Sequence, residues 1–235
     1  MKITHLKSNL VQLTRYPVLF PMNCYLVTED DGLTLVDSTM SSPADDIAAI
    51  ADQLGKQLRR VALTHAHGDH VGGVSGVRQR FPEVEVSIAK RDAPILEGEK
   101  TLLPSEPQTA VKGYFVKVDW KPDRLLEPGD RIGSLEVVAS PGHTPGHIAF
   151  LDVRDRSLIA GDAFQTRGGI AVSGDLRLLF PFPAMATWNR QTALASAVAL
   201  RALNPSLLGV GHGPTLSEPA AAMDRAIEAA RRAFS

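Results

Sequence analysis

Thr64-His65-Ala66-His67-Gly68-Asp69-His70 is the stretch of the sequence that decides the fold, because four side chains able to bind a divalent cation occupy its last six positions. Neutral imidazole and carboxylate are ligands that zinc accepts. A short apolar strand is predicted directly before it, at residues 60–64, and a helix directly after it, at residues 74–81. Any one of these histidines alone could cap a helix or lie solvated in a loop. Together they predict a metal site at the end of a strand.

Three further candidate ligands follow apolar runs elsewhere in the chain. His143 lies in Ser140-Pro141-Gly142-His143-Thr144-Pro145-Gly146-His147, Asp162 follows a predicted strand at residues 158–160, and His212 lies in Gly211-His212-Gly213-Pro214. Each lies near glycines, which allow the backbone to approach an ion closely. Because one strand end supplies only part of two coordination shells, we expect these residues to complete them. His147 is an alternative ligand four positions after His143, whereas the isolated His5 is expected to be a surface or packing residue.

Strands and helices are predicted along the whole chain. Residues 23–28 and 33–37 form strands around a turn at 29–32 that has the residues of a hairpin. Ser42-Pro43 predicts the start of a helix with an apolar stripe. Further strands are predicted at 84–89, 135–139, 148–151, 158–160 and 207–210, and long helices at 187–203 and 219–234. The pattern indicates an α/β (α+β) core rich in strands, with outer helices.

The domain organisation is predicted to be simple. No repeat, low-complexity tract or flexible linker divides the sequence, so residues 1–235 are expected to form a single domain. Two stretches, 97–120 and 167–185, are broken by prolines and glycines and fit neither helix nor strand. We expect them to be loops or insertions that lie over a site.

Composition and charge narrow the choice of partners. The chain has 25 basic and 26 acidic side chains, so it offers no net positive field for a nucleic-acid backbone or an anionic membrane. Neither a secretory signal nor a stretch long enough to cross a bilayer is recognisable. With Cys24 as the single cysteine, no internal disulfide forms, and the cytoplasm is the expected location. A small-molecule substrate is expected, and the oligomeric state is left open.

The order of these motifs resembles the metallo-β-lactamase fold superfamily, in its glyoxalase II and lactonase-like branch, from the strand before Asp37 to Pro214. This resemblance implies a four-layer αββα sandwich of two mixed sheets flanked by helices, with metals at one edge between the sheets. It implies that the first metal is held by His65, His67 and His143, the second by Asp69, His70 and His212, and that Asp162 bridges them. The residues by themselves support these ligand types but not this pairing.

Two more residues are expected near the metals. Asp37, at the end of its strand, is expected to orient a ligand histidine, with an ordinary turn or cap role as the alternative. The family pattern assigns the metal to His143, so His147 is expected to support the site from outside it, or else to be a hydrogen-bonded structural histidine. The implied cofactors are two divalent ions per chain, with zinc as the default and iron or manganese as alternatives.

The implied reaction is hydrolysis. Two cations sharing a water would lower its pKa toward about 7, and the resulting hydroxide would attack an ester, thioester or lactone-type bond of a small molecule. Asp69 and Asp162 are the expected catalytic residues: Asp162 bridges the metals, and Asp69 orients the hydroxide or passes a proton to the leaving group.

Two other functions stay open. One is a persulfide dioxygenase that uses a single iron, because such enzymes share much of the ligand set; the other is a metal-binding protein without hydrolytic activity. Diiron flavoproteins are disfavoured, since Ala66 and Gly68 fill spacers in which an acidic residue is typical. A lactonase is less favoured because residues 163–167 contain no tyrosine, unless Tyr114 folds over the metals from the irregular middle segment.

Two apolar regions could shape a substrate pocket. One contains Phe20, before the predicted strand at 23–28, and the other contains Phe182. We hypothesise that they form a flap and an opposing wall for a partly apolar acyl substrate. The alternative is ordinary packing of a hairpin and a helix.

Overall fold

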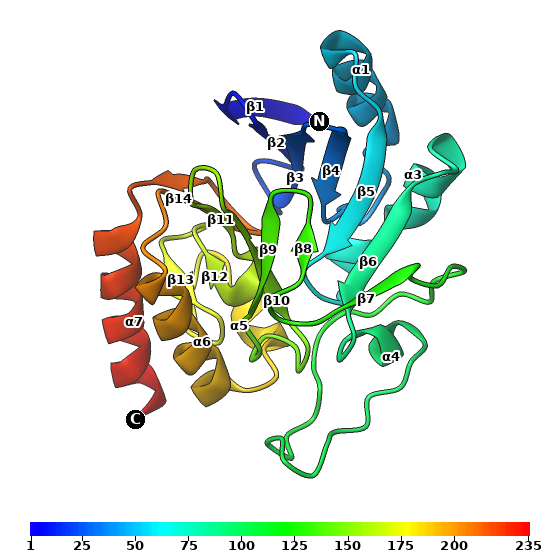
Figure 1. Ribbon diagram of the computed structural model, residues 1–235. Helices are drawn as coiled ribbons and strands as arrows, with labels where there is room; N and C mark the ends of the chain where they lie inside the picture. The colour runs from blue at the N-terminus through cyan, green and yellow to red at the C-terminus, as the bar shows by residue number, and fades with distance from the viewer.

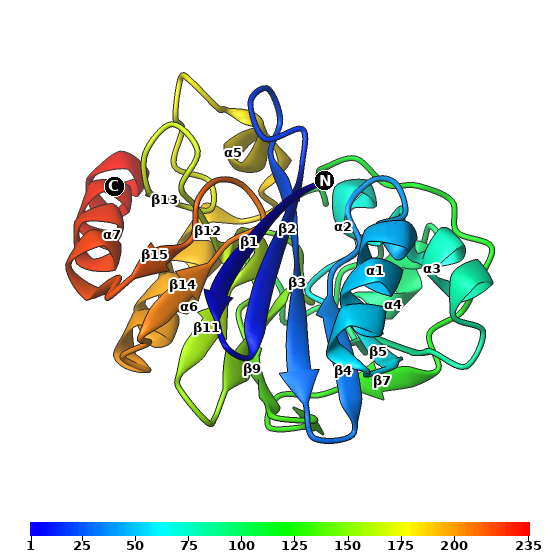
Figure 2. The same cartoon turned by 90° about the horizontal axis from the view of Figure 1, so that it is seen from above.

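Two β-sheets pack face to face in the computed structural model, which describes residues 1–235, and helices cover the outer face of each sheet (Figures 1 and 2). The first sheet has seven strands in chain order: β1 (Lys2–Lys7), β2 (Leu10–Arg15), β3 (Met22–Glu29), β4 (Gly32–Val36), β5 (Leu58–Leu63), β6 (Glu85–Ala89) and β7 (Arg124–Leu126). Strands β1 to β4 pair antiparallel, and β4 to β7 pair parallel.

The second sheet has six strands and is also mixed. In spatial order they are β15 (Leu216–Ser217), β14 (Leu207–Gly209), β11 (Ser157–Ile159), β10 (Ile148–Asp152), β9 (Leu135–Ala139) and β8 (Arg131–Ile132). Its one parallel pair is β11 with β14. A separate two-stranded ribbon joins β12 (Phe164–Gln165) to β13 (Ala171–Val172).

The helices lie on both outer sides of the sheets (Figure 2). They are α1 (Ala44–Leu54), α2 (Gly68–Val71), α3 (Val74–Arg80), α4 (Ala93–Leu96), α5 (Phe182–Ala186), α6 (Arg190–Ala202) and α7 (Ala220–Phe234), with a 3-10 turn η1 (Gly161–Ala163). Helices α1 and α3 accompany the first sheet, and α6 and α7 accompany the second. None of the helices combines the length and the apolar character that crossing a bilayer requires.

Three apolar clusters join these four layers. The middle cluster lies between the sheets, where Val36 and Phe150 are both fully buried. The outer clusters join the first sheet to α1 and α3, and the second sheet to α6 and α7. Strands such as β4 and β10 are buried along their whole length because both faces of each sheet are covered. The predicted αββα sandwich of two mixed sheets is therefore confirmed.

One edge of the sandwich collects many of the strand ends that carry polar residues. The parallel strands β4, β5 and β6 all end there. In the second sheet β9, β11 and β14 end at the same edge, because β10 runs antiparallel to β9 and β11. The loops that follow these strands therefore meet, although they are far apart in the sequence.

Most predicted elements are present, with some corrections. The helix predicted at 187–203 begins at Arg190, because Asn189 caps it by accepting a hydrogen bond from the Thr192 N–H. Thr187 and Trp188 instead lie in the preceding loop. No range was predicted for β1, β2 or α4. The short strands β7, β8, β12, β13 and β15 were also missed, because they carry too few residues to show a period. Residues 97–123 contain neither helix nor strand, whereas 167–185 include β13 and most of α5.

Candidate metal centre

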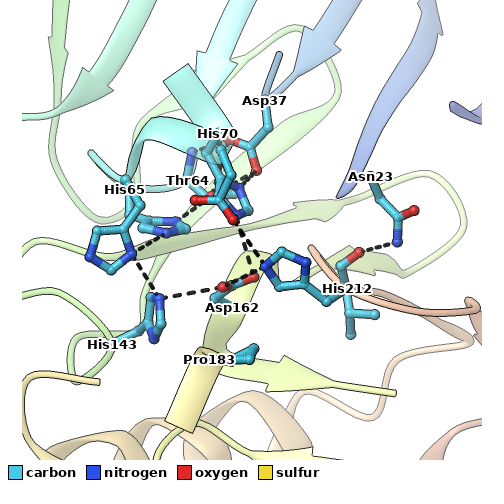
Figure 3. Close-up of polar contacts among 12 residues, drawn as sticks. Asn23, Asp37, Thr64, His65, His70, His143, Asp162, Pro183 and His212 are labelled. Atoms are coloured by element: carbon cyan, nitrogen blue, oxygen red, sulfur yellow. Dashed lines mark hydrogen bonds and ion pairs between the residues drawn. The ribbon is translucent and has the colours of Figure 1, made fainter. Parts of the chain in front are cut away.

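Seven histidine and aspartate side chains meet at this edge, between the ends of the two sheets (Figure 3). Four come from the loop after β5 and the start of α2, and the others follow β9, β11 and β14. Three groups have ligand atoms within 4.8 Å of one another: His65 with His67 and His143, His65 with His70 and Asp162, and Asp69 with His70 and His212. The structure thus brings together every ligand that the sequence predicts.

The tightest of these groups consists of His65, His67 and His143, which we call the three-histidine group. His67 Nδ1 lies 3.1 Å from His65 Nε2 and 3.0 Å from His143 Nε2. Tetrahedral zinc, with bonds of about 2.0–2.1 Å to nitrogen, holds its ligand nitrogens at about 3.3 Å from one another. The spacing of the three nitrogens is therefore close to what a metal ion requires.

The second group contains Asp69, His70 and His212. His212 Nε2 lies 3.3 Å from Asp69 Oδ2 and 3.2 Å from Asp162 Oδ2. Asp162 stands between the two groups: its Oδ2 is also 3.3 Å from His143 Nε2, and its Oδ1 is 3.5 Å from His70 Nε2. The carboxylate of Asp162 can therefore contact ions in both groups.

Hydrogen bonds to groups outside the centre fix the tautomer of each histidine, and so decide which ring nitrogen directs its lone pair into the centre. His67 Nε2 donates to the Lys112 carbonyl (2.9 Å), and His212 Nδ1 donates to the Pro21 carbonyl (2.7 Å), since a carbonyl oxygen only accepts. The Thr64 hydroxyl donates to Asp37, so His65 Nδ1 must donate to the Thr64 oxygen at 3.0 Å.

His143 is fixed by a longer chain of hydroxyl groups. Thr187 Oγ1 donates to the Pro183 carbonyl (2.7 Å), so Ser173 Oγ donates to Thr187 (2.9 Å). His143 Nδ1 then donates to Ser173 Oγ at 2.9 Å, which leaves its Nε2 as a lone pair.

These tautomers test whether the residues fit a metal. In the three-histidine group, the lone pair of His67 Nδ1 faces those of His65 Nε2 and His143 Nε2 at 3.1 and 3.0 Å, an arrangement that repels unless a cation lies between them. In the rest of the centre, the buried His70 Nε2 and Asp162 Oδ1 have no hydrogen-bond partner. Imidazole and carboxylate form the donor set that divalent cations such as zinc and iron accept, so the residues fit the expected cofactor.

In the metal-free protein, the three-histidine group differs in protonation from His70 and His212. Burial, reinforced by the neighbouring histidines, holds the pKa of His65 well below its ordinary value, and burial also lowers the pKa of His67 and His143. Burial opposes the charged form of His70 as well, but Asp37, Asp162 and Asp69 outweigh it and raise the pKa of His70 to about 9. Asp162 and Asp69 likewise overcome burial and raise the pKa of His212 well above its ordinary value.

Asp37 contacts His70 from outside the centre. Its Oδ2 accepts from His70 Nδ1 at 2.8 Å, and its Oδ1 accepts from the Thr64 N–H at 2.8 Å. Asp37 adopts a positive φ of 61°, a backbone conformation that is uncommon for residues other than glycine. The contact that the predicted orienting role requires is thus present.

His147 has both ring nitrogens engaged. Its Nε2 accepts from the Asp162 N–H at 3.1 Å, and its Nδ1 donates to Ser140 Oγ at 2.8 Å. Burial lowers the pKa of His147 to about 3, so the ring is neutral and can accept. No nitrogen of His147 is free for a metal, and the ring instead supports the backbone of Asp162.

The irregular segment 97–123 lies over the centre. His67 donates to the Lys112 carbonyl, and the Gly68 N–H donates to the Tyr114 carbonyl at 2.8 Å. Gly113 has a φ of +116°, and a Cβ there would lie 2.0 Å from His67 Nε2, so only glycine fits. Tyr114 lines the cavity above the metal residues, as the sequence-based hypothesis for it required. Whether its hydroxyl assists a reaction stays a prediction.

A cavity of about 380 Å³ opens onto the centre. Phe20 lies on one side, with its ring centroid 5.0 Å from that of Phe182 and 5.3 Å from that of His212. The wall beyond is formed by α5, including Phe182 and Met185. No lysine or arginine lines this cavity.

Several supporting residues were not found from the sequence. Ser173 and Thr187 orient His143. Asn23, which Figure 3 labels beside His212, donates to the carbonyls of Val210 and Gly213 on either side of that histidine. Thr187 was assigned to a helix, and Asn23 was treated only as the start of a strand. The one signal that could have indicated them is that each is a polar residue next to the end of a strand or helix at this edge of the sheets.

Known proteins resemble this chain over most of its length. A Bacillus subtilis (strain 168) protein described as "Uncharacterized protein YobT" is 48% identical over 99% of this chain and 100% of its own. YflN of the same organism, a "Probable metallo-hydrolase", is 30% identical over 80% of this chain and 78% of its own. The Haemophilus influenzae hydroxyacylglutathione hydrolase GloC is 31% identical over 64% of this chain and 70% of its own.

Solved structures share the fold. A metallo-beta-lactamase from Pontibacter korlensis superposes with a TM-score of 0.73 over 98% of both chains, at 16% identity. TTHA1623, solved in a di-iron-bound form, gives a TM-score of 0.61 over 89% of this chain and 95% of its own, at 27% identity. The family model of the metallo-beta-lactamase superfamily matches residues 18–212. With the fold, the grouped histidines and aspartates and these relatives in agreement, the chain belongs to the metallo-beta-lactamase superfamily.

Proposed function

We propose that the protein is a hydrolase with two divalent metal ions, which cleaves an ester, thioester or lactone-type bond of a small uncharged substrate. The observation that carries the proposal is the convergence of three imidazole lone pairs at 3.0–3.1 Å beside a second histidine and aspartate group. A relative described as a probable metallo-hydrolase and another named as a hydroxyacylglutathione hydrolase support hydrolysis as the reaction.

We assign the ligands as the sequence resemblance implies. The three-histidine group would hold one ion, Asp69, His70 and His212 would hold the other, and Asp162 would stand between them. When bound, two such cations supply an activated water at neutral pH and polarise the acceptor oxygen of the substrate. Zinc is the expected metal, and iron fits the same donors.

The chain's own residues supply orientation and proton transfer. The Asp69 side chain is partly open to the cavity, and His70 and His212 keep its pKa well below the ordinary value against the effect of burial. As a carboxylate it would orient the attacking water, take a proton from it and pass that proton to the leaving group. His147 and Asp37 keep Asp162 and His70 in place from behind.

The cavity favours an apolar substrate. Its wall offers Phe20, Tyr114, Phe182 and Met185 but no lysine or arginine to pair with a carboxylate or phosphate. Away from the metal ions, an anionic recognition group on the substrate would lose its hydration without gaining a cationic side chain as a partner. We infer that the reacting carbonyl belongs to a neutral acyl compound, which Phe20 contacts together with Phe182 and Met185 of α5.

The test is elemental analysis of protein purified without added metal, combined with hydrolysis assays before and after chelation. The panel contains neutral esters, thioesters and lactones, each beside a matched analogue that carries a carboxylate. Two ions per chain, and chelator-sensitive hydrolysis that favours the neutral member of each pair, are expected. A single iron without hydrolysis would instead indicate an oxygenase, and a fully metallated protein inactive on the whole panel would indicate metal binding without catalysis.

A further inference from the structure

Asp92 is a fully buried carboxylate that belongs to no ligand group. It follows β6 and begins α4, at the same sheet edge as the metal centre, and its exposed fraction is 0%. Burying an ionisable side chain is costly unless its oxygens are well satisfied. The position of Asp92 therefore calls for an explanation beyond the turn that it occupies.

The carboxylate of Asp92 joins the two loops that carry the three-histidine group. Its Oδ2 accepts from the Ala66 N–H at 3.0 Å, and Ala66 lies between His65 and His67. The same oxygen accepts from the Thr144 hydroxyl at 2.6 Å, and Oδ1 accepts from the Gly146 N–H at 2.7 Å, in the loop that carries His143.

The atoms around Asp92 are closely packed. A Cβ at position 146 would lie 2.4 Å from the Asp92 backbone nitrogen and 2.7 Å from Asp92 Oδ1, so the loop that carries His143 approaches Asp92 this closely only because residue 146 is glycine. Asp92 is also tied to its own strand, since its N–H donates to the Ala89 carbonyl. The carboxylate is thus held in place, and the loop of His65 and His67 and the loop of His143 both donate hydrogen bonds to it.

We propose that Asp92 is a positioning residue that sets the spacing of the three-histidine group, although it touches none of the three histidines. This inference rests on the proposed function only in that the group binds a metal ion. The nitrogens of His65 and His67 lie on one loop and that of His143 on another, so their separation depends on the distance between the loops. Asp92 bridges that distance with three hydrogen bonds, whereas the group of Asp69, His70 and His212 receives no bond from it.

Asp92→Asn is the first variant to test. An amide has one oxygen, so it cannot accept on both sides, and its NH₂ group would face the donor of Gly146 or those of Ala66 and Thr144. Cobalt titration followed by visible absorption reports the number of ions and their ligand geometry, and competition with a zinc chelator reports each affinity. We expect affinity for one of the two ions to fall about 10- to 100-fold, the range typical for lost supporting contacts, with a changed cobalt spectrum.

Matched variants separate positioning from general destabilisation. Thr144→Val removes one of the three bonds at nearly constant volume, and Thr144→Ser restores it, so the first should weaken the same ion and the second should not. Asp152→Asn changes another buried, hydrogen-bonded aspartate, at the far end of β10, and should leave both affinities and the spectrum unchanged.

The outcomes distinguish this inference from the proposed function. If the wild-type chain binds two ions and Asp92→Asn binds both with wild-type affinity and spectrum, Asp92 is not a positioning residue. If Asp92→Asn does not fold, Thr144→Val decides, and a result equal to that of Thr144→Ser overturns the inference. A wild-type chain that binds no ion overturns the proposed function itself.

Discussion

At the scale of single residues, the centre is organised by hydrogen bonds that point away from it. The carbonyls of Lys112 and Pro21, and the Thr64 hydroxyl, each accept a histidine N–H and so direct the other ring nitrogen inward. Such outer contacts also orient the ring and raise its basicity as a ligand. The chemistry of the centre therefore depends on groups that would never bind a metal themselves.

Asp162 is the residue whose loss should matter most, because its carboxylate lies within 3.5 Å of nitrogens from both groups. Asp162→Ala should reduce hydrolysis by more than roughly 100-fold, since even the loss of outer contacts costs 10- to 100-fold. It should also lower the bound metal to one ion per chain, measured by elemental analysis. Retained activity would contradict the proposed bridging role, and Asp152→Asn again serves as the control.

Metal binding should release protons at neutral pH. The raised pKa of His70, about 9, means that its proton is present at pH 7 in the free protein and is lost as pH rises through 9. The pKa of His212 is raised well above its ordinary value, so its proton is also present at pH 7 in the free protein. A metal must displace these protons, so affinity should rise with pH, roughly tenfold per unit for each proton displaced.

Titration with zinc in weakly buffered solution containing a pH indicator would measure this release. His212→Gln should release less acid than the wild type. The pKa values of the three-histidine group are already lowered, so an ion bound there alone should displace no histidine proton. Zinc binding at both sites without any acid release would contradict the assignment of His70 and His212 as ligands.

At the scale of elements, the strand ends bring the ligands together and two loop regions close over them. The segment 97–123 lacks regular structure, yet its backbone is held on His67 and Gly68 by two hydrogen bonds. On the other side, the loop before β3 packs Phe20 against Phe182 at the start of α5. The edge that carries the candidate metal centre is thus walled by segments that contact residues of the centre.

The phenylalanine pair should govern substrate binding more than chemistry. We expect Phe20→Ala and Phe182→Ala each to raise KM for a neutral, apolar ester by roughly tenfold, from lost apolar contact of about 1.5 kcal/mol, with kcat little changed. Steady-state kinetics on folded variants would measure KM and kcat separately. Leu178→Ala is the control, because that side chain is 89% exposed and outside the cavity. Unchanged kinetics in both phenylalanine variants would leave ordinary packing as their role.

At the scale of the whole molecule, the metal centre joins the two sheets. His65 and His70 follow β5 of the first sheet, whereas His143, Asp162 and His212 follow strands of the second. Away from the metal centre, the two sheets are held together by the apolar cluster around Phe150. Bound ions would therefore link the same two layers that the core already joins.

Removal of metal should lower the stability of the whole molecule. An ion at about 1,000 times its dissociation constant stabilises the native state by about 4 kcal/mol, which corresponds to a loss of about 10 °C in Tm on chelation for a chain of this size. Calorimetry before and after chelation would measure it. An unchanged Tm in protein shown to lose its metal would mean that the ions do not link the sheets.

Much of the fold and the metal residues could be predicted from the sequence, because their signals are local. Apolar runs mark β5 and β14, and the close spacing of His65, His67, Asp69 and His70 marks the centre directly. The short edge strands could not be predicted, since two or three residues carry no period. The start of α6 was misplaced because the cap at Asn189 was not recognised, so the loop residue Thr187 was counted as helical.

The sequence by itself determined the family to which the chain belongs and which side chains are predicted to bind metal, because both depend on residue types at fixed positions along the chain. Only the tertiary structure decided which groups support those side chains. Asp92 and Ala66 are separated by 26 positions and Asp92 and Gly146 by 54, yet one buried carboxylate joins them. Such a contact leaves no local pattern, because it arises when parallel strands end at the same sheet edge and burial leaves each polar atom to find its partner there.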